Sequence, residues 1–153
     1  MPINLVVPGE PRGKGRPRFV RATGRTYTPA ETEQAEGDVL TVWMAAGRPR
    51  IDGPVCLTVE LVLSRPKAHW RADGTLGLAG QRAWWPTRKP DLDNAWKLLA
   101  DALSGRAFGD DAQVVYTLAW KRWARPGEAP HARVAVVAAP LYFEAGSSEG
   151  VAA

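Results

Sequence analysis

The alternation of hydrophobic and polar positions predicts four longer β-strands and one small hairpin. In residues 55–63 every second position is Val or Leu, which is typical of a strand with one face on a core. Residues 3–9, 112–124 and 131–139 also have strand character, and the last two are expected to pair as a hairpin across the segment RPGEAP. The short runs RFV and RTY could pair as a smaller hairpin across ATG.

Two segments have the apolar spacing of an amphipathic helix. Residues 29–46 follow a favourable start, in which Thr28 can cap the helix and Glu31 can complete a capping box. Residues 93–104 form the second predicted helix, and Gly105 supplies a plausible C-terminal stop. The buried stripe of this second helix comprises Ala95, Leu98, Leu99, Ala102 and Leu103.

The resulting order is strands, helix, strand, helix and two strands, which predicts an α+β domain over residues 1–140. Two helices are expected to pack on a mixed β-sheet around a single core. Residues 65–90 form a long connection, and loops of that length are usually functional or disordered. Residues 141–153 are small and polar, and we expect a disordered tail there.

Basic residues are clustered along the chain, although the net charge is only +4, from 20 Lys and Arg against 16 Asp and Glu. Such clusters suit a polyphosphate partner, but they also occur in solvated loops. The candidate DNA-binding residues are Lys14, Arg16, Arg18, Arg88 and Lys89. Trp84 and Trp85 could stack on bases, pin their loop to the sheet, or lie in a dimer interface.

Several classes of site and location are not expected. Cys56 is the only cysteine and His69 and His131 are the only histidines, so neither a disulfide nor a zinc site is predicted. No glycine-rich nucleotide-binding pattern is found in a strand–loop–helix context. The sequence has neither a membrane-length apolar run nor a secretory signal, and a cytoplasmic protein is therefore expected.

Five carboxylates lie within residues 91–111 of this basic chain, and their spacing permits one pocket. Asp91 and Asp93 precede the second helix in extended backbone, where residues two apart point the same way. Residues 104–110 are long enough to bring Asp110 and Asp111 back toward them. Lys97 would lie one helical turn from Asp93.

Carboxylates that converge repel one another unless a cation neutralises them, and Mg²⁺ or Mn²⁺ prefers such oxygen ligands. A carboxylate-bound Mg²⁺ among basic side chains suits phosphodiester hydrolysis, with Lys97 placed to contact the scissile phosphate. The alternative is structural. In that reading the acids cap helices, and Asp93, Lys97 and Asp101 form a solvated ladder of ion pairs.

The motif DLDN, Lys97, DAL and DDAQV, together with GKGRPRF and TYTP, resembles the RusA family of Holliday junction resolvases, which are often encoded by prophages. The resemblance covers roughly residues 3–138 and is most specific over residues 89–115. The tryptophan-containing loop before the second helix departs from the short connection of the best-known members.

This resemblance implies a RusA-like fold and a homodimeric, Mg²⁺-dependent endonuclease that nicks two opposed strands of a four-way DNA junction. By motif position, Asp91, Asp93 and Asp111 would bind the metal ion, and Asp110 is a neighbouring acid that could join them. Lys97 would be the essential lysine, and Asp101 would support it. Two other readings remain open, namely a non-catalytic module that binds branched DNA and a nuclease that cuts flaps or replication forks.

Overall fold

The computed structural model describes residues 1–140, so the tail predicted for residues 141–153 lies outside the described residues. Over residues 1–140 the fold is α+β, with a mixed four-stranded sheet, a separate hairpin and three α-helices. The strands are β1 (Ile3–Pro8), β2 (Arg18–Val20), β3 (Arg25–Tyr27), β4 (Val55–Leu63), β5 (Val114–Trp123) and β6 (His131–Ala138). The helices are α1 (Ala30–Ala45), α2 (Leu78–Arg82) and α3 (Leu92–Leu103), with two short 3₁₀ turns, η1 (Lys67–His69) and η2 (Asp111–Gln113).

The strand order of the sheet is β1-β6-β4-β5. β4 pairs in parallel with β5 on one side and antiparallel with β6 on the other. The predicted hairpin between β5 and β6 is therefore wrong, because β4 lies between them. β4 is the most completely buried strand, and a central position covers both of its edges with hydrogen bonds.

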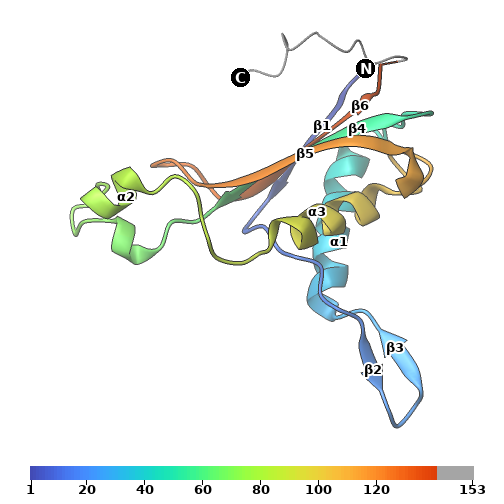
Figure 1. The fold of residues 1–153 in the computed structure, drawn as a ribbon, viewed down its shortest axis with the longest axis horizontal. Coiled ribbons are helices and arrows are strands. Elements are labelled where there is room, and N and C mark those ends of the chain that lie inside the picture. Colours follow the sequence, from blue (N-terminus) through green and yellow to red (C-terminus); the bar gives the residue numbers. More distant parts are fainter. Residues whose placement is uncertain (141–153) are drawn as a thin grey trace.

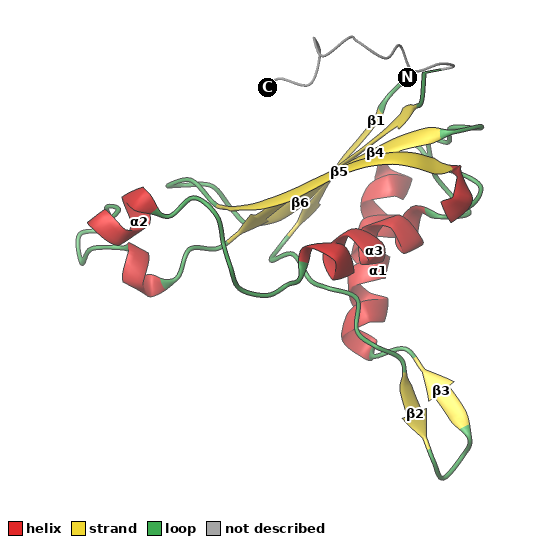
Figure 2. Cartoon of the chain, viewed as in Figure 1, coloured by secondary structure: helices red, strands yellow, loops and turns green. Residues whose placement is uncertain are grey.

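One face of the sheet is covered by α1 and α3, and the core lies between them (Figure 1). Alternate residues of β1, β4 and β6 enter this core, as the period of two in the sequence predicts. The buried stripe predicted for α3 is confirmed. Within residues 1–140, the opposite face of the sheet carries no helix (Figure 2).

Both long helices occur where the apolar spacing predicts them. Gly105 follows α3 with φ of +74°, a left-handed conformation that glycine adopts without strain. The capping box predicted at the start of α1 is wrong, because Pro29 occupies the N-cap and no side chain caps the helix. The helix begins one residue later than predicted, at Ala30, which moves Thr28 out of the capping position.

The long connection between β4 and α3 is ordered and contains η1 and α2, so there is one more helix than predicted. Arg65 holds this segment together by donating hydrogen bonds to the carbonyl oxygens of Ala124, Gly80 and Ala83, at 2.7, 2.8 and 3.1 Å. The segment lies at one end of the sheet, away from the β2–β3 hairpin (Figure 1). No helix within residues 1–140 is long and apolar enough to cross a membrane.

Candidate nucleic-acid interface and carboxylate sites

An open groove of about 790 Å³ runs between the N-terminal arm, the start of α1 and the start of α3. All five predicted DNA-binding residues line it, and they come from two segments far apart in the sequence, namely Lys14, Arg16 and Arg18 from the arm and Arg88 and Lys89 from the loop before α3. Asp91 and Asn94 line the same groove. The fold therefore brings guanidinium and ammonium groups together beside the first carboxylate of the predicted site.

Two glycines let the arm pass close to the helices. A Cβ atom on Gly13 would lie 3.3 Å from the Cβ of Asn94, and one on Gly15 would lie 2.7 Å from Oγ1 of Thr32. The arm is held there by hydrogen bonds from the Lys14 N–H to the Asn94 carbonyl, at 3.0 Å, and from the Gly15 N–H to Thr32 Oγ1, at 2.9 Å. The spacing of these glycines is thus explained by close approach and not by phosphate binding.

Lys14 also lines the groove, but its ammonium group is already paired. Its Nζ donates to Asp101 and lies 3.7 Å from Glu36. The hydrogen bond to Asp101 raises the pKa of Lys14, although partial burial opposes that change. Asp101 therefore anchors the arm through Lys14, whereas the sequence predicted that it would support Lys97.

Asp91 and Asp93 stand at the beginning of α3. Asp91 is the N-cap residue, yet its side chain makes no capping hydrogen bond, and both carboxylates are exposed. Lys97 is exposed one turn further along and takes part in none of the ion pairs within residues 1–140. The predicted ladder of ion pairs along α3 is therefore not formed in the described part of the chain.

Asp110 and Asp111 lie near the other end of α3. The Asp110 side chain accepts a hydrogen bond from the Ala112 N–H at 2.8 Å and completes a capping box with Gln113 at η2. Gln113 also donates to the Gly53 carbonyl at 2.7 Å, which ties this turn to the start of β4. Asp111 is exposed on η2.

The two pairs of acids do not meet within one chain. Lys121 lies close to the first pair, Asp91 and Asp93. Its Nζ donates to the carbonyl oxygens of Arg88 and Pro90, just before Asp91, at 2.6 and 3.0 Å. The second pair precedes Val114, the first residue of β5, and from there to Lys121 the strand extends about 23 Å. Among residues 1–140, no three His, Cys, Asp or Glu residues are close enough to hold a metal ion.

Trp84 and Trp85 differ in their surroundings. The backbone carbonyl of Trp84 accepts a hydrogen bond from Trp123 at the end of β5, and the guanidinium groups of Arg122 and Arg125 lie 5.8 and 6.0 Å from its ring. Trp84 thus helps to fasten the β4–α3 connection to the sheet. Trp85 is 63% exposed and remains available for a partner.

Sequence reasoning missed two contributors to this region. Lys121 holds the loop before Asp91 in place, and a lone lysine on a predicted strand gives no signal of that contact. Asn94 receives the arm through its carbonyl oxygen and also lines the groove. The two glycines of the arm were the available signal for a close backbone approach.

Comparisons with known proteins match most of the chain. The family model described as "Endodeoxyribonuclease RusA" matches residues 8–136. A Bacillus subtilis (strain 168) protein, named "Uncharacterized protein YqaN", is 34% identical over 117 residues, which cover 74% of this chain and 82% of that protein. The match spans the arm, the β2–β3 hairpin, both long helices, β4 and β5, and it includes β6 up to residue 136 but only the last residue of β1.

Proposed function

Because this chain belongs to the RusA family of endodeoxyribonucleases, we propose that it is a Mg²⁺-dependent nuclease that resolves four-way DNA junctions by paired, symmetric nicks. Mn²⁺ would be a plausible substitute for Mg²⁺. In this proposal the substrate is branched DNA and the working unit is a homodimer, because two opposed cuts need two sites. The protein would act in the cytoplasm, on the nucleoid.

The observation that carries this proposal is a largely basic groove with Asp91 in its lining. Arg16, Arg18 and Lys89 could neutralise phosphates along a strand of DNA. Arg88 lines the same groove, but its guanidinium donates to the Ser64 carbonyl at 2.9 Å and lies 3.5 Å from Glu10. Asp91 lines the same groove, so a phosphate backbone held there would pass beside the start of α3. A basic groove alone would suit any DNA-binding protein, whereas the adjoining acids favour a nuclease.

The metal-binding residues proposed are Asp91, Asp93 and Asp111, with Asp110 beside them. Within one chain these residues do not complete a site, because the two pairs lie near opposite ends of α3. When bound, Mg²⁺ would supply charge neutralisation at the scissile phosphate. Lys97 is exposed on the α3 turn that follows Asp93, and we propose that it contacts the same phosphate.

A second copy of the chain could bring the two pairs together at the free edge of β5. The N–H group of Trp123 points away from β4 and donates to the Trp84 carbonyl. Because N–H groups two residues apart in a strand point to the same edge, those of Thr117 and Ala119 also point to the free edge of β5. Neither N–H has a backbone partner outside the sheet within residues 1–140. Antiparallel pairing of two β5 strands about Thr117 would satisfy these groups and carry the partner's acidic turn toward Lys121 and Asp91.

Complementation between inactive variants tests this assignment. Asp91→Asn and Asp111→Asn are each expected to abolish Mg²⁺-dependent cleavage of a synthetic four-way junction. In the proposed dimer each site combines Asp91 and Asp93 of one subunit with Asp110 and Asp111 of the other. Mixing the two variants then restores one intact site in each heterodimer. Random exchange would then return about a quarter of the wild-type sites, seen as single nicks instead of paired cuts.

A matched control uses Asp91→Asn with Asp93→Asn, since both changes fall in the same pair and no mixture can restore a site. Recovery in the first mixture but not in the control supports shared sites. No recovery in either mixture means that each site lies within one chain, and the proposed β5 contact is then wrong.

The second candidate function is a non-catalytic module that binds branched DNA, and the separation of the acids in one chain favours it. The wild-type protein distinguishes the two candidates. Nicks that appear with Mg²⁺ and disappear with a chelator support the nuclease, whereas a shifted junction without nicks supports the module. Competition with flap and fork substrates would identify a nuclease that prefers those structures.

A further inference from the structure

The β2–β3 hairpin projects away from the rest of the chain as a two-stranded ribbon (Figure 1). Every residue of both strands is exposed. Two-stranded hairpins are at best marginally stable in water when nothing covers them. An ordered ribbon that leaves apolar side chains in solvent is therefore best explained by a partner that binds it.

The hairpin has two chemically different faces. Its register pairs Arg18 with Tyr27, Phe19 with Thr26 and Val20 with Arg25. Neighbouring residues of a strand point to opposite faces, so Phe19 and Thr26 share one face, and the other face carries Arg18, Val20, Arg25 and Tyr27. Phe19 is 62% exposed, which is unusual for a phenyl ring in a folded chain.

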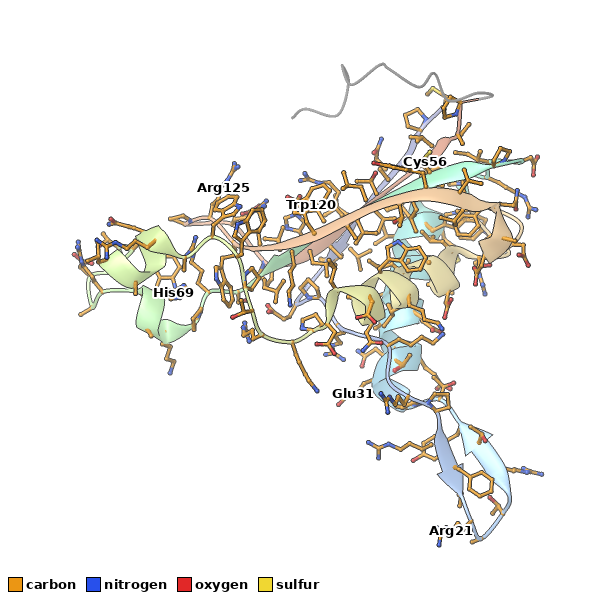
Figure 3. All side chains as sticks on the ribbon, in the orientation of Figure 1. Arg21, Glu31, Cys56, His69, Trp120 and Arg125 are labelled. Atoms are coloured by element: carbon orange, nitrogen blue, oxygen red, sulfur yellow. The ribbon has the colours of Figure 1, made fainter. Side chains whose placement is uncertain are left out.

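The charge of the hairpin identifies the partner as a polyanion. Residues 16–27 contain four arginines and no acidic residue. One of the four, Arg21, extends from the tip (Figure 3). Arg18 lines the basic groove, so the hairpin continues the surface already proposed to bind DNA. An exposed aromatic ring within an arginine-rich segment is the combination that binds unpaired bases together with their phosphates.

The base of the hairpin is anchored on both sides. Before it, Lys14 and Gly15 are hydrogen-bonded to Asn94 and Thr32. After it, the chain enters α1 (Ala30–Ala45), which packs against α3. The direction of the hairpin is therefore set relative to α3, the helix that begins with Asp91.

We propose that the hairpin inserts at the branch point of the DNA, where Phe19 stacks on an unpaired or unstacked base and the arginines hold the flanking phosphates. The inference deepens the proposed function and rests on it, since it takes branched DNA as the substrate. It adds an element that recognises the branch point and is separate from the acidic residues.

Binding to a junction that carries the fluorescent base 2-aminopurine at its crossover tests the inference. Ca²⁺ replaces Mg²⁺ in this assay so that no strand is cut. The wild-type protein should increase the fluorescence as the base leaves its stack. Phe19→Ala should lose most of that increase and bind the junction about 10-fold more weakly, while its affinity for linear duplex stays the same.

Two further variants make the result specific. Val6→Ala removes another exposed apolar side chain, 50% exposed on β1, and should change neither signal. The double variant Arg21→Gln, Arg25→Gln should weaken binding to junction and duplex alike. It should also lower the slope of log K against log salt by about 1.8, because two phosphate contacts are lost.

Two outcomes would overturn the inference. One is a Phe19→Ala protein with wild-type junction affinity and an undiminished fluorescence change. The other is a Phe19→Ala dimer that dissociates in sedimentation and loses junction and duplex affinity equally, which would make the hairpin a contact between subunits. Because no cleavage is measured, failure of the proposed nuclease activity is a separate result.

Discussion

Replacing Glu128 by Gln removes one carboxylate from a cluster of charges on the face of the sheet opposite α1 and α3. Both oxygens of Glu128 accept from the Arg122 guanidinium, at 2.7 and 2.8 Å, and one also accepts from the Arg125 N–H at 2.7 Å. Arg122 in turn donates to Glu60 at 2.8 Å, and its side chain is only 7% exposed. The variant would leave this buried guanidinium with one carboxylate in place of two.

The size of the effect follows from the pKa of Glu128. The hydrogen bonds from Arg122 lower this pKa from 4.5 to about 2, although burial opposes the change. A difference of that size between folded and unfolded chains corresponds to about 3 kcal/mol of stability. The Glu128 side chain is 23% exposed and solvent screens it, so we expect Glu128→Gln to cost about 1–2 kcal/mol at pH 7.

The dependence on pH distinguishes this charge effect from a packing effect. Because the pKa is lower in the folded chain, the stabilisation is complete above pH 4.5 and is lost as the pH falls toward 2. Urea unfolding should therefore show the full difference between wild type and Glu128→Gln at pH 7, and less than half of it at pH 3. Asp38→Asn, which changes an exposed acid in the middle of α1 that takes part in none of the ion pairs within residues 1–140, is the control and should show no difference at either pH. Equal urea midpoints at pH 7, or a difference that is undiminished at pH 3, would refute the reasoning.

Three further changes test the packing. Gly15→Ala would place a Cβ atom 2.7 Å from Thr32 Oγ1, and we expect a loss of about 1–3 kcal/mol in urea unfolding; wild-type stability would show that the arm is not held as described. Gly37→Ala on α1 meets nothing within 4 Å and should stabilise the protein by about 1 kcal/mol, so a loss would contradict the open space found there. Arg65→Met removes three hydrogen bonds to carbonyl oxygens and should speed proteolytic cleavage within residues 67–82, and an unchanged cleavage rate would contradict the anchoring role of Arg65.

The spacing of apolar residues predicts correctly those helices and strands whose own residues decide their conformation. The stripe of α3 and the alternation of β4 report which side faces a core, whatever lies across from it. The pairing of β5 was wrong because adjacency in sequence favours a hairpin, whereas burial of β4 requires neighbours on both of its edges.

The predicted site shows the same division. The sequence indicated which acids and bases belong to the motif, and the structure gathers Arg16, Arg18, Arg88, Lys89 and Asp91 along one groove. The distance between the two acid pairs could not be read from the chain. The segment after α3 is long enough to return, but Gln113 and Gly53 tie it to the start of β4 instead.

By itself, the sequence determined the class of fold, the two long helices, the basic arm and the family, because these depend on residue type and short-range spacing. The tertiary structure alone decided that β4 separates β5 from β6, that Lys14 pairs with Asp101, and that the acid pairs lie near opposite ends of α3. The reason is physical. A side chain's chemistry is local, but which groups meet depends on how strands and helices compete to bury the same apolar surface.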